Sequence, residues 1–184
     1  MIKLGAKELR AIKANPEEIK KIPRNPIYII CDNVLDTYNV GSIFRLADAV
    51  AAEEVILCGQ TETPPNTRIK KASINTTEWV KWRYVSTAAE AIRDLRIKNY
   101  DLRVICVEQN ERSRLYNKAD YSFPIALVVG NETYGVAKEV LDVSDEIVEI
   151  PMWGVNKSLN VMVSLGIVLF EVMEKSTQKD YIVK

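Results

Sequence analysis

The sequence predicts one α/β domain, a mostly parallel sheet of six strands flanked by helices. Apolar runs rich in β-branched residues alternate with helical patterns along the chain, and this alternation is typical of parallel sheets. The 184 residues, of which 47% are hydrophobic, suffice for one full domain and fall short of two ordinary ones. No internal repeat interrupts the alternation. We expect the domain to occupy residues 26–175, between a short, helical, basic extension at 1–25 and a polar tail at 176–184.

The expected strands are short apolar runs, and they lie at residues 27–31, 55–58, 81–85, 102–107, 125–129 and 147–150. Helices are expected where apolar residues recur three and four apart, at residues 40–51, 87–98 and 137–143. Asn15 and Pro16 predict the start of a short helix before the first strand, because Asn caps helices and Pro suits their first turn. The segment 60–66, QTETPPN, is expected to form a loop.

The last helix, expected at residues 159–173, differs from the others because it is apolar nearly all round. Asn160, Ser164 and Glu171 interrupt it, and its ~15 residues are too few to cross a bilayer. It is therefore either an ordinary core helix or a helix whose second face is covered by a partner subunit. Ser158 is expected to cap its N-terminus.

The chain contains no histidine, and this excludes several chemistries. A Ser-His-Asp triad, an HExxH zinc site, a haem with an axial His and a histidine general base all need an imidazole. Cys31, Cys58 and Cys106 are odd in number and show no CxxC spacing, so we expect buried core thiols and an intracellular protein. The sequence shows no signal peptide, membrane span or cluster of metal ligands, so a cytoplasmic protein without a metal is expected.

The charge is balanced in total but uneven along the chain. Lys and Arg number 25, as do Asp and Glu, and this balance argues against coating of nucleic acid by bulk charge. Residues 1–25 nevertheless carry +4, from seven cations and three anions, and residues 66–83 carry +4, from five cations and one anion. These two segments either form one phosphate-binding face or are solvated surface.

Three segments place polar residues or glycines where a strand gives way to a helix. They are 33–49 (NVLDTYNVGSIFRLADA), 127–136 (LVVGNETYGV) and 150–163 (IPMWGVNKSLNVMV). Ligands of parallel sheets bind at the carboxyl ends of the strands, although each segment alone could be purely structural. The dinucleotide fingerprint GxGxxG is absent, and Val136-Ala137 replaces the Lys-Ser/Thr of a P-loop after Gly130 and Gly135.

Taken in order, the patterns NVGxxxRxADA, VVGNExxGV and IPMxGxxxSLNVxVxxGIxLFE resemble the three motifs of the SpoU (TrmH) group of RNA ribose 2′-O-methyltransferases, in the SPOUT superfamily. The resemblance runs from about residue 26 to residue 173, nearly the whole chain. The stretch 71–80 (KASINTTEWV) also looks like the family, with Asn75-Thr76-Thr77 where members often have Gly-Ala. The resemblance implies a parallel sheet whose C-terminal part is tied in a trefoil knot.

The family's cofactor is S-adenosylmethionine, and the resemblance implies that a pocket of strand ends and glycine turns holds it. Carried over position by position, the cofactor-binding residues are Val107, Glu108, Gly130, Asn131, Glu132, Ile150, Met152, Ser158, Leu159 and Asn160. Mostly backbone groups and aliphatic side chains would then hold adenine and ribose. Such a pocket explains the absence of both nucleotide fingerprints.

The implied reaction is attack of an RNA ribose 2′-hydroxyl on the cofactor methyl group. The resemblance gives the catalytic positions as Arg45, Asn39, Glu132, Ser158 and Asn160, with Arg45 as the family's base. An arginine is an awkward base, because its pKa above ~12 keeps it protonated at neutral pH. Arg45 is therefore expected to bind the phosphate or ribose beside the target and to align the hydroxyl, whose proton passes to that phosphate or to water.

The resemblance also implies a homodimer through the last helix, with Arg45 of one subunit beside the cofactor of the other. The RNA-face candidates are Lys20, Lys21, Arg24, Arg68, Lys70 and Lys71. Only about 25 residues precede the first strand, so the chain has no room there for the separate RNA-binding domain of many rRNA-modifying members, and tRNA is the favoured substrate. Ribosomal RNA is the alternative with the same chemistry, and a non-catalytic RNA-binding protein is the alternative of a different class.

Overall fold

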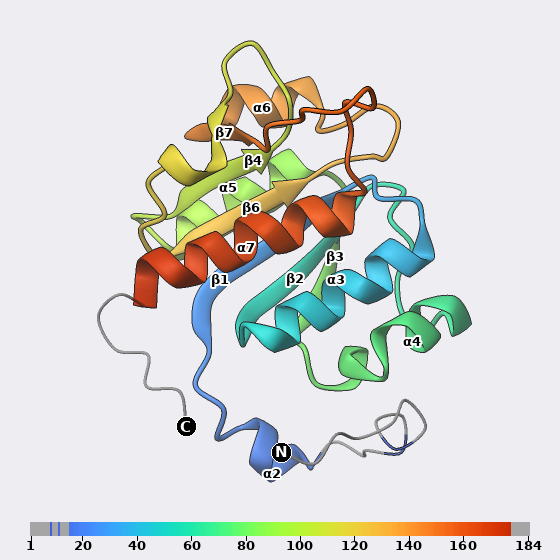
Figure 1. Cartoon of the computed structure of the whole chain (residues 1–184). Helices are drawn as coiled ribbons and strands as arrows, with labels where there is room; N and C mark the ends of the chain where they lie inside the picture. Colours follow the sequence, from blue (N-terminus) through green and yellow to red (C-terminus); the bar gives the residue numbers. More distant parts are fainter. Residues whose placement is uncertain (1–7, 9–10, 12–14, 178–184) are drawn as a thin grey trace.

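The computed structural model describes residues 8, 11 and 15–177 (Figure 1). Its sheet has seven strands, in the order β3-β2-β1-β6-β4-β7-β5, and every strand pair is parallel. The strands are β1 (Asn25–Asp32), β2 (Ala52–Cys58), β3 (Trp82–Val85), β4 (Arg103–Val107), β5 (Arg114–Leu115), β6 (Ile125–Val129) and β7 (Glu146–Glu149). The parallel α/β sheet is therefore confirmed.

The predicted strand count of six was wrong by one. Each of the six expected strands is present within three residues of its predicted ends. The additional strand, β5, has two exposed residues and pairs only with β7 at the edge of the sheet. A two-residue edge strand that begins with Arg114 buries no apolar run, so the pattern that predicted the others could not detect it.

Helix α2 precedes the first strand, α7 follows the last, and the other helices lie between strands. The described helices are α2 (Pro16–Ile19), α3 (Thr37–Ala49), α4 (Thr67–Ser73), α5 (Ala88–Lys98), α6 (Lys138–Val143) and α7 (Val161–Thr177), with 3₁₀ turns η1 (Thr76–Glu78) and η2 (Tyr116–Lys118). The predicted start at Asn15 is correct, because its Oδ1 accepts a hydrogen bond from the Glu17 amide at 3.0 Å. Parts of the predicted extension 1–25 and of the predicted tail 176–184 fall at residues 1–7, 9–10, 12–14 and 178–184, which lie outside the described residues.

Several helix boundaries and one whole helix differ from the prediction; at the C-terminal ends, α3 stops two residues early and α7 extends four residues further. Helix α3 begins three residues early, because Asp36 caps it by accepting from the Tyr38 amide at 2.8 Å, and α7 begins two residues late. Helix α4 was not predicted; Asn66 starts it by accepting from the amides of Arg68 and Ile69. A seven-residue helix with one large apolar residue turned inward leaves too little periodicity to detect.

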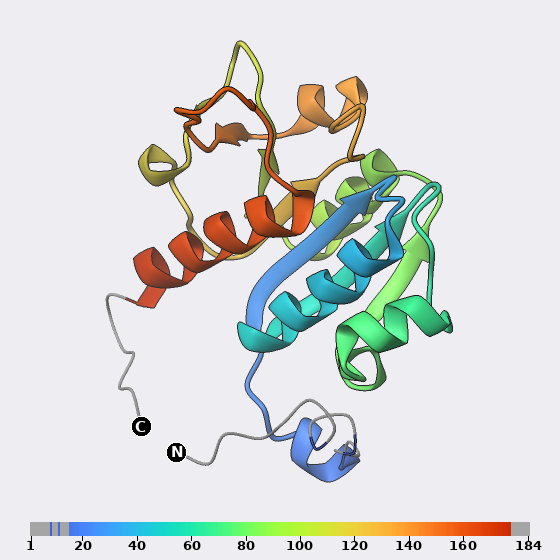
Figure 2. The ribbon, with the colours of Figure 1, turned by 45° about the vertical axis from the view of Figure 1, so that its right-hand side comes forward.

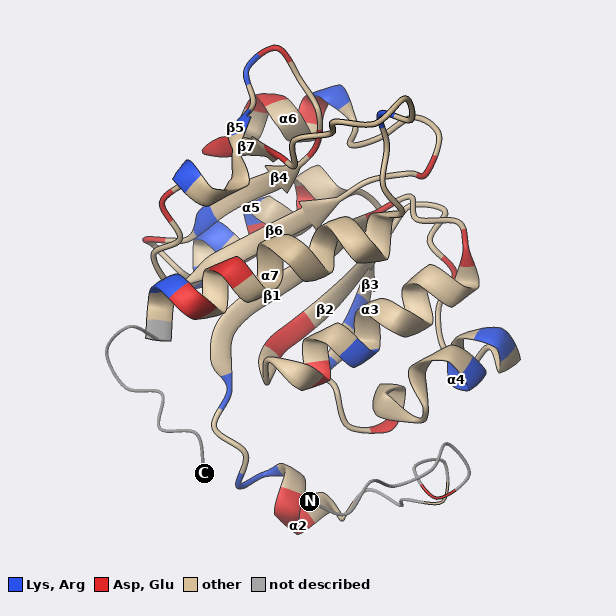
Figure 3. Cartoon of the chain, viewed as in Figure 1, with Lys and Arg blue, Asp and Glu red and all other residues tan. Residues whose placement is uncertain are grey.

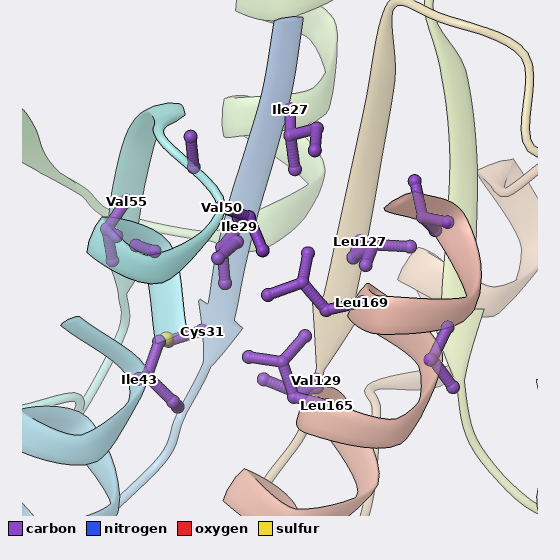
Figure 4. Packing of buried hydrophobic residues seen from close by; sticks show 14 of the residues in the cluster. Ile27, Ile29, Cys31, Ile43, Val50, Val55, Leu127, Val129, Leu165 and Leu169 are labelled. Atoms are coloured by element: carbon purple, nitrogen blue, oxygen red, sulfur yellow. The ribbon is translucent and has the colours of Figure 1, made fainter. Parts of the chain in front are cut away.

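Helices cover both faces of the sheet and make three layers (Figures 1 and 2). One face packs against α3, α4 and α7, and its core includes Ile29, Ile43 and Leu169, all fully buried (Figure 4). The other face packs against α5 and α6. Each fully buried side chain of this kind contributes roughly 1.5–3 kcal/mol, so the domain has an ample core on both faces. The trefoil knot that the resemblance implies stays a prediction.

The three cysteines are free and buried, as predicted. Cys31 and Cys58 come from neighbouring strands but belong to opposite faces of the sheet. Burial raises the pKa of all three thiols, and it raises the pKa of Cys58 and of Cys106 to about 12. Because the thiolate is the reactive form, these cysteines are packing residues.

The strand order brings the functional segments together. Strands β1, β6, β4 and β7 are consecutive neighbours and all point the same way. The chain that leaves their carboxyl ends therefore collects at one edge of the sheet, and this is where parallel sheets bind ligands. The loop part of each predicted motif begins at this edge, at Asn33, Gly130 and Ile150.

Candidate functional site

A cavity of about 460 Å³ lies at the carboxyl ends of β4, β6 and β7 and the start of α7. All ten predicted cofactor residues line it: Val107, Glu108, Gly130, Asn131, Glu132, Ile150, Met152, Ser158, Leu159 and Asn160. The lining also contains nine residues that are not among the ten predicted, namely Gln109, Val129, Thr133, Gly135, Val148, Glu149, Asn156, Val161 and Ser164. The rule that strand ends converge could have indicated Gln109 and Glu149, which directly adjoin predicted residues.

A tight glycine turn forms one wall of this cavity. Asn131 and Gly135 exchange two backbone hydrogen bonds, of 3.0 and 2.9 Å, which close the turn. Gly135 has φ +71°, a left-handed conformation that favours glycine, and a Cβ there would lie 2.2 Å from Glu108 Oε2. A Cβ on Gly130 would lie 2.2 Å from the carbonyl carbon of Gly135. Both positions therefore require glycine.

Three side chains fix the neighbouring loops. Glu108, directly after β4, accepts from the Val136 amide at 2.9 Å and so ties β4 to the glycine turn. Gln109 donates through Nε2 to the backbone oxygen of Lys157 at 2.6 Å, which ties β4 to the loop 150–160. Asn131 donates to the backbone oxygen of Asn33 at 2.9 Å and joins the second motif to the first.

Glu132 joins the glycine turn to the start of α3. Its carboxylate accepts three hydrogen bonds: from the Leu35 amide (3.0 Å), the Asp36 amide (3.1 Å) and Asn39 Nδ2 (2.9 Å). Burial raises the pKa of Glu132, but these three donors outweigh burial and hold the pKa below its ordinary value of 4.5. A carboxylate with three hydrogen-bond donors is a poor proton acceptor, but it braces the site by holding the glycine turn against the start of α3.

Replacing Glu132 by glutamine should therefore weaken the brace, because an amide nitrogen would face backbone N–H donors. We expect a loss of ~1 kcal/mol of stability at pH 7, the typical cost of a lost hydrogen bond to a partly exposed group. Because the folded-state pKa is lowered, the wild-type contribution is present above pH 4.5 and is lost as the pH falls through the folded value. The Tm difference between wild type and Glu132→Gln should shrink accordingly below pH 4.5.

Glu111→Gln is the matched control, since Glu111 is exposed and its side chain makes no hydrogen bond or ion pair within the described part of the chain. Thermal unfolding at several pH values measures both variants. Identical Tm profiles for the two substitutions would show that the carboxylate of Glu132 does not brace the site.

Asn39 extends the same network to the last helix. Its Oδ1 accepts from Asn160 Nδ2 at 2.9 Å, so a chain of side chains runs from Glu132 through Asn39 to Asn160. Asn160 Oδ1 also accepts from the Met162 amide at 3.0 Å, and α7 begins at Val161. Asn160 is therefore the residue that caps α7.

The prediction that Ser158 caps the last helix was wrong. Ser158 lies three residues before the helix, and its amide and hydroxyl both donate to Asn156 Oδ1 at 3.2 Å. Serine and asparagine are equally good caps, so the sequence alone could not decide between two positions two residues apart. Ser158 nevertheless lines the cavity.

Arg45 stands apart from the cavity of its own chain. It lies eight residues after Thr37, more than two turns into α3, and it does not line the cavity. Its side chain is exposed and makes no hydrogen bond or ion pair with the described part of the chain. Four of the five predicted catalytic residues are thus joined at one site, and Arg45 is the exception.

The predicted RNA-face residues come from the segment after α2 and from α4 (Figure 3). Arg24 donates to the backbone oxygen of Trp79 at 3.3 Å, and this contact joins the two basic segments. Lys20 and Lys70 form exposed ion pairs with Glu17 and Glu78. Lys21, Arg68 and Lys71 are exposed, with no side-chain partner among the described residues.

Within the described residues, no group of three or more His, Cys, Asp or Glu side chains is placed to hold a metal ion. In the same part of the chain, every helix is too short or too polar to span a membrane.

Fold and site together define an α/β protein with a ligand cavity at the carboxyl ends of its parallel strands, built from three polar motifs. Residues 26–170 match the family model described as the SpoU rRNA Methylase family. The chain belongs to this family.

Named relatives modify two kinds of RNA. The chain is 30% identical over 166 residues to a tRNA (guanosine(18)-2′-O)-methyltransferase of Aquifex aeolicus, covering 88% of this chain and 75% of that one. It is 34% identical over 150 residues to the 23S rRNA (guanosine-2′-O-)-methyltransferase RlmB of Ralstonia nicotianae, covering 82% of this chain but only 59% of that one. The crystal structure of an AdoMet-bound rRNA methyltransferase from Sinorhizobium meliloti is similar, with a TM-score of 0.75, 29% identity and coverage of 85% of this chain and 60% of that one.

Proposed function

We propose that this protein transfers a methyl group from S-adenosylmethionine to a ribose 2′-hydroxyl of structured RNA, with tRNA as the favoured substrate. The observation that carries the proposal is the cavity in which the second and third motifs meet, linked to the first motif through Glu132 and Asn39. The relatives' names support the reaction class, and the similarity to the AdoMet-bound methyltransferase of Sinorhizobium meliloti supports the cofactor.

The residues of the cavity fit this cofactor. A volume of about 460 Å³ falls within the usual range for small-molecule sites. Val107, Ile150 and Leu159 offer apolar surface for a flat base, and the glycine turn lets a ligand approach the backbone. The described lining includes three carboxylates and no Lys or Arg; the carboxylates belong to Glu108, Glu132 and Glu149. Such a lining suits a cofactor that carries a sulfonium and an ammonium group.

The chain's own residues would position the reactants. S-adenosylmethionine supplies an electrophilic methyl group that needs no metal or imidazole. Arg45 holds the phosphate or ribose beside the target and aligns the 2′-hydroxyl, whose proton passes to that phosphate or to water. Glu132 and Asn39 hold the start of the Arg45 helix, so they are positioning residues rather than proton acceptors.

A homodimer through α7 would bring Arg45 to a cavity. One face of this helix packs in the core through Leu165, Leu169 and Val172, while Val163 and Phe170 on another face are 40% and 53% exposed. Exposed apolar side chains in line on one helix mark an interaction surface. Since Arg45 does not line the cavity of its own chain, we propose that it serves the cavity of the partner subunit.

Phe170→Glu should convert the dimer to a monomer and abolish transfer, because a buried, unpaired carboxylate opposes association. Sedimentation velocity at micromolar protein measures the change. Ile97→Glu is the control, since Ile97 is a more exposed apolar residue on α5, at the opposite face of the sheet. A Phe170→Glu protein that stays dimeric would place the interface elsewhere.

Transfer of labelled methyl groups to total tRNA and to rRNA, followed by mapping of the modified nucleotide, tests the reaction and the substrate together. We expect label in tRNA, and we expect binding to weaken steeply with salt if Lys20, Lys21, Arg24, Arg68, Lys70 and Lys71 contact phosphates. The Ralstonia relative supports rRNA as the second candidate. If titration with S-adenosylmethionine produces no heat of binding while the protein still binds RNA, the protein is a non-catalytic RNA-binding protein. With an RNA substrate of either kind, the protein would work in the cytoplasm.

A further inference from the structure

A second cavity, of about 370 Å³, lies away from the first, where α4, η1 and the start of β3 meet. Pro64, Pro65, Lys70, Thr77, Glu78 and Trp82 are among the residues that line it. None of its lining residues lines the first cavity. The proposed methyl transfer assigns no role to this second cavity.

The walls of the second cavity have the chemistry of a nucleotide site. The Trp82 indole and the two proline rings are flat or compact apolar surfaces of the kind that stack on a base. The indole N–H of Trp82 and the hydroxyl of Thr77 have no hydrogen-bond partner among the described residues. Glu78 adds a carboxylate that can accept from the N–H groups of a base edge. Stacking surface and polar groups therefore lie at one place.

Positive charge gathers on α4 (Figure 3), and this helix contributes Thr67 and Lys70 to the lining of the cavity. Lys70 lines it, 3.3 Å from Glu78, and both side chains are largely open to solvent. Arg68 and Lys71, on the same helix, are exposed and without side-chain partners in the described part of the chain. Three cations beside a stacking surface complement the phosphates that flank an unstacked base.

The cavity is also held rigidly to the helix of Arg45. Helix α4 packs so closely on α3 at Gly41 that a Cβ there would lie 2.6 Å from Ala72 Cβ and 2.7 Å from the backbone oxygen of Ile69. A nucleotide bound at Trp82 would thus be fixed relative to Arg45, four residues after Gly41 on α3.

We infer that this second cavity binds one unstacked nucleotide of the RNA substrate, with its base against Trp82 and its phosphates at Lys70 and Arg68. The inference rests on the proposed function, because it names a second contact of the same substrate. It makes RNA recognition a two-point attachment, in which the nucleotide at Trp82 sets the register of the target ribose at the first cavity.

Trp82→Leu and Lys70→Ala test the inference in the whole chain. Leucine keeps apolar volume where Trp82 packs against the core, and it removes the flat ring. We expect each variant to weaken tRNA binding by about 10-fold or more, with the KM for RNA raised, kcat and S-adenosylmethionine affinity unchanged, and Trp82→Tyr close to wild type. Lys98→Ala is the control, as Lys98 is an exposed lysine of α5 with no side-chain partner among the described residues.

Filter binding and photo-crosslinking of thiouridine-containing tRNA measure the contact without methyl transfer, so they remain informative if the proposed reaction fails. A crosslinked peptide that contains Trp82 or Lys70 supports the inference. Unchanged RNA affinity in folded Trp82→Leu and Lys70→Ala proteins overturns it. The inference is also overturned if free mononucleotides bind the second cavity without competing with tRNA, or if a protein partner binds there in place of RNA.

Discussion

Arg45→Ala is expected to lower methyl transfer to RNA by about 100-fold or more, while cofactor affinity and stability stay as in the wild type. The loss follows from positioning, since misplacing a reacting group by about 1 Å already costs ~100-fold. The selectivity follows from the structure, because the Arg45 side chain is exposed and has no partner in the described part of the chain. Surface substitutions of this kind usually change stability by less than about 0.5 kcal/mol.

Arg45→Lys should recover only part of the rate, because an ammonium group keeps the charge but loses the planar, two-pronged geometry of guanidinium. Arg93→Ala is the matched control: Arg93 is an exposed arginine on α5 without a side-chain partner among the described residues. Single-turnover kinetics measure the rate of methyl transfer, calorimetry measures the affinity for S-adenosylmethionine, and thermal unfolding measures stability. Full transfer by Arg45→Ala would remove the residue from the mechanism.

The strands were predictable because each buries an apolar run, and the cavity was predictable because parallel strands deliver their carboxyl ends to one edge. The family resemblance assigned residues as distant as Val107 and Leu159 to one pocket, and both line the cavity. The roles within that pocket were not all predictable. Glu132 is counted by its motif among catalytic residues, yet its three hydrogen-bond donors, Leu35, Asp36 and Asn39, come from more than 90 residues earlier.

The features that escaped prediction are those set by small, local energies. Helix α4 depends on one capping asparagine and one buried isoleucine, and β5 depends on pairing with a single neighbour. The boundary of α7 depends on whether Ser158 or Asn160 takes the cap. Differences of ~1 kcal/mol decide such cases, and hydrophobic periodicity does not register them.

Gly130→Ala is expected to abolish S-adenosylmethionine binding in the range where the wild type binds. The added Cβ would lie 2.2 Å from the carbonyl carbon of Gly135 and 2.3 Å from the amide nitrogen of Val136. These are backbone atoms of the turn that walls the cavity, so the turn itself must move. We expect a loss of about 1–3 kcal/mol of stability, typical of overpacking, together with loss of cofactor affinity.

Gly154→Ala is the matched control, because a Cβ at Gly154 meets no atom within 4 Å although the loop 150–160 also borders the cavity. Calorimetry and thermal unfolding should find Gly154→Ala close to wild type in both affinity and Tm. If Gly130→Ala fails to fold, the cofactor affinity of Asn131→Ala reports on the same turn and should be lowered. Wild-type cofactor affinity in a folded Gly130→Ala protein would contradict the placement of the cofactor.

The Arg45→Ala and Gly130→Ala variants together also test whether Arg45 acts across the proposed dimer. In a mixed dimer of one Arg45→Ala subunit and one Gly130→Ala subunit, the intact Arg45 of the second faces the intact cavity of the first. Coexpression with two affinity tags should yield roughly half of the wild-type rate, because one of the two symmetric sites is restored. If Arg45 served the cavity of its own subunit, each site would carry one damaged component, and the mixed dimer would be as inactive as either parent.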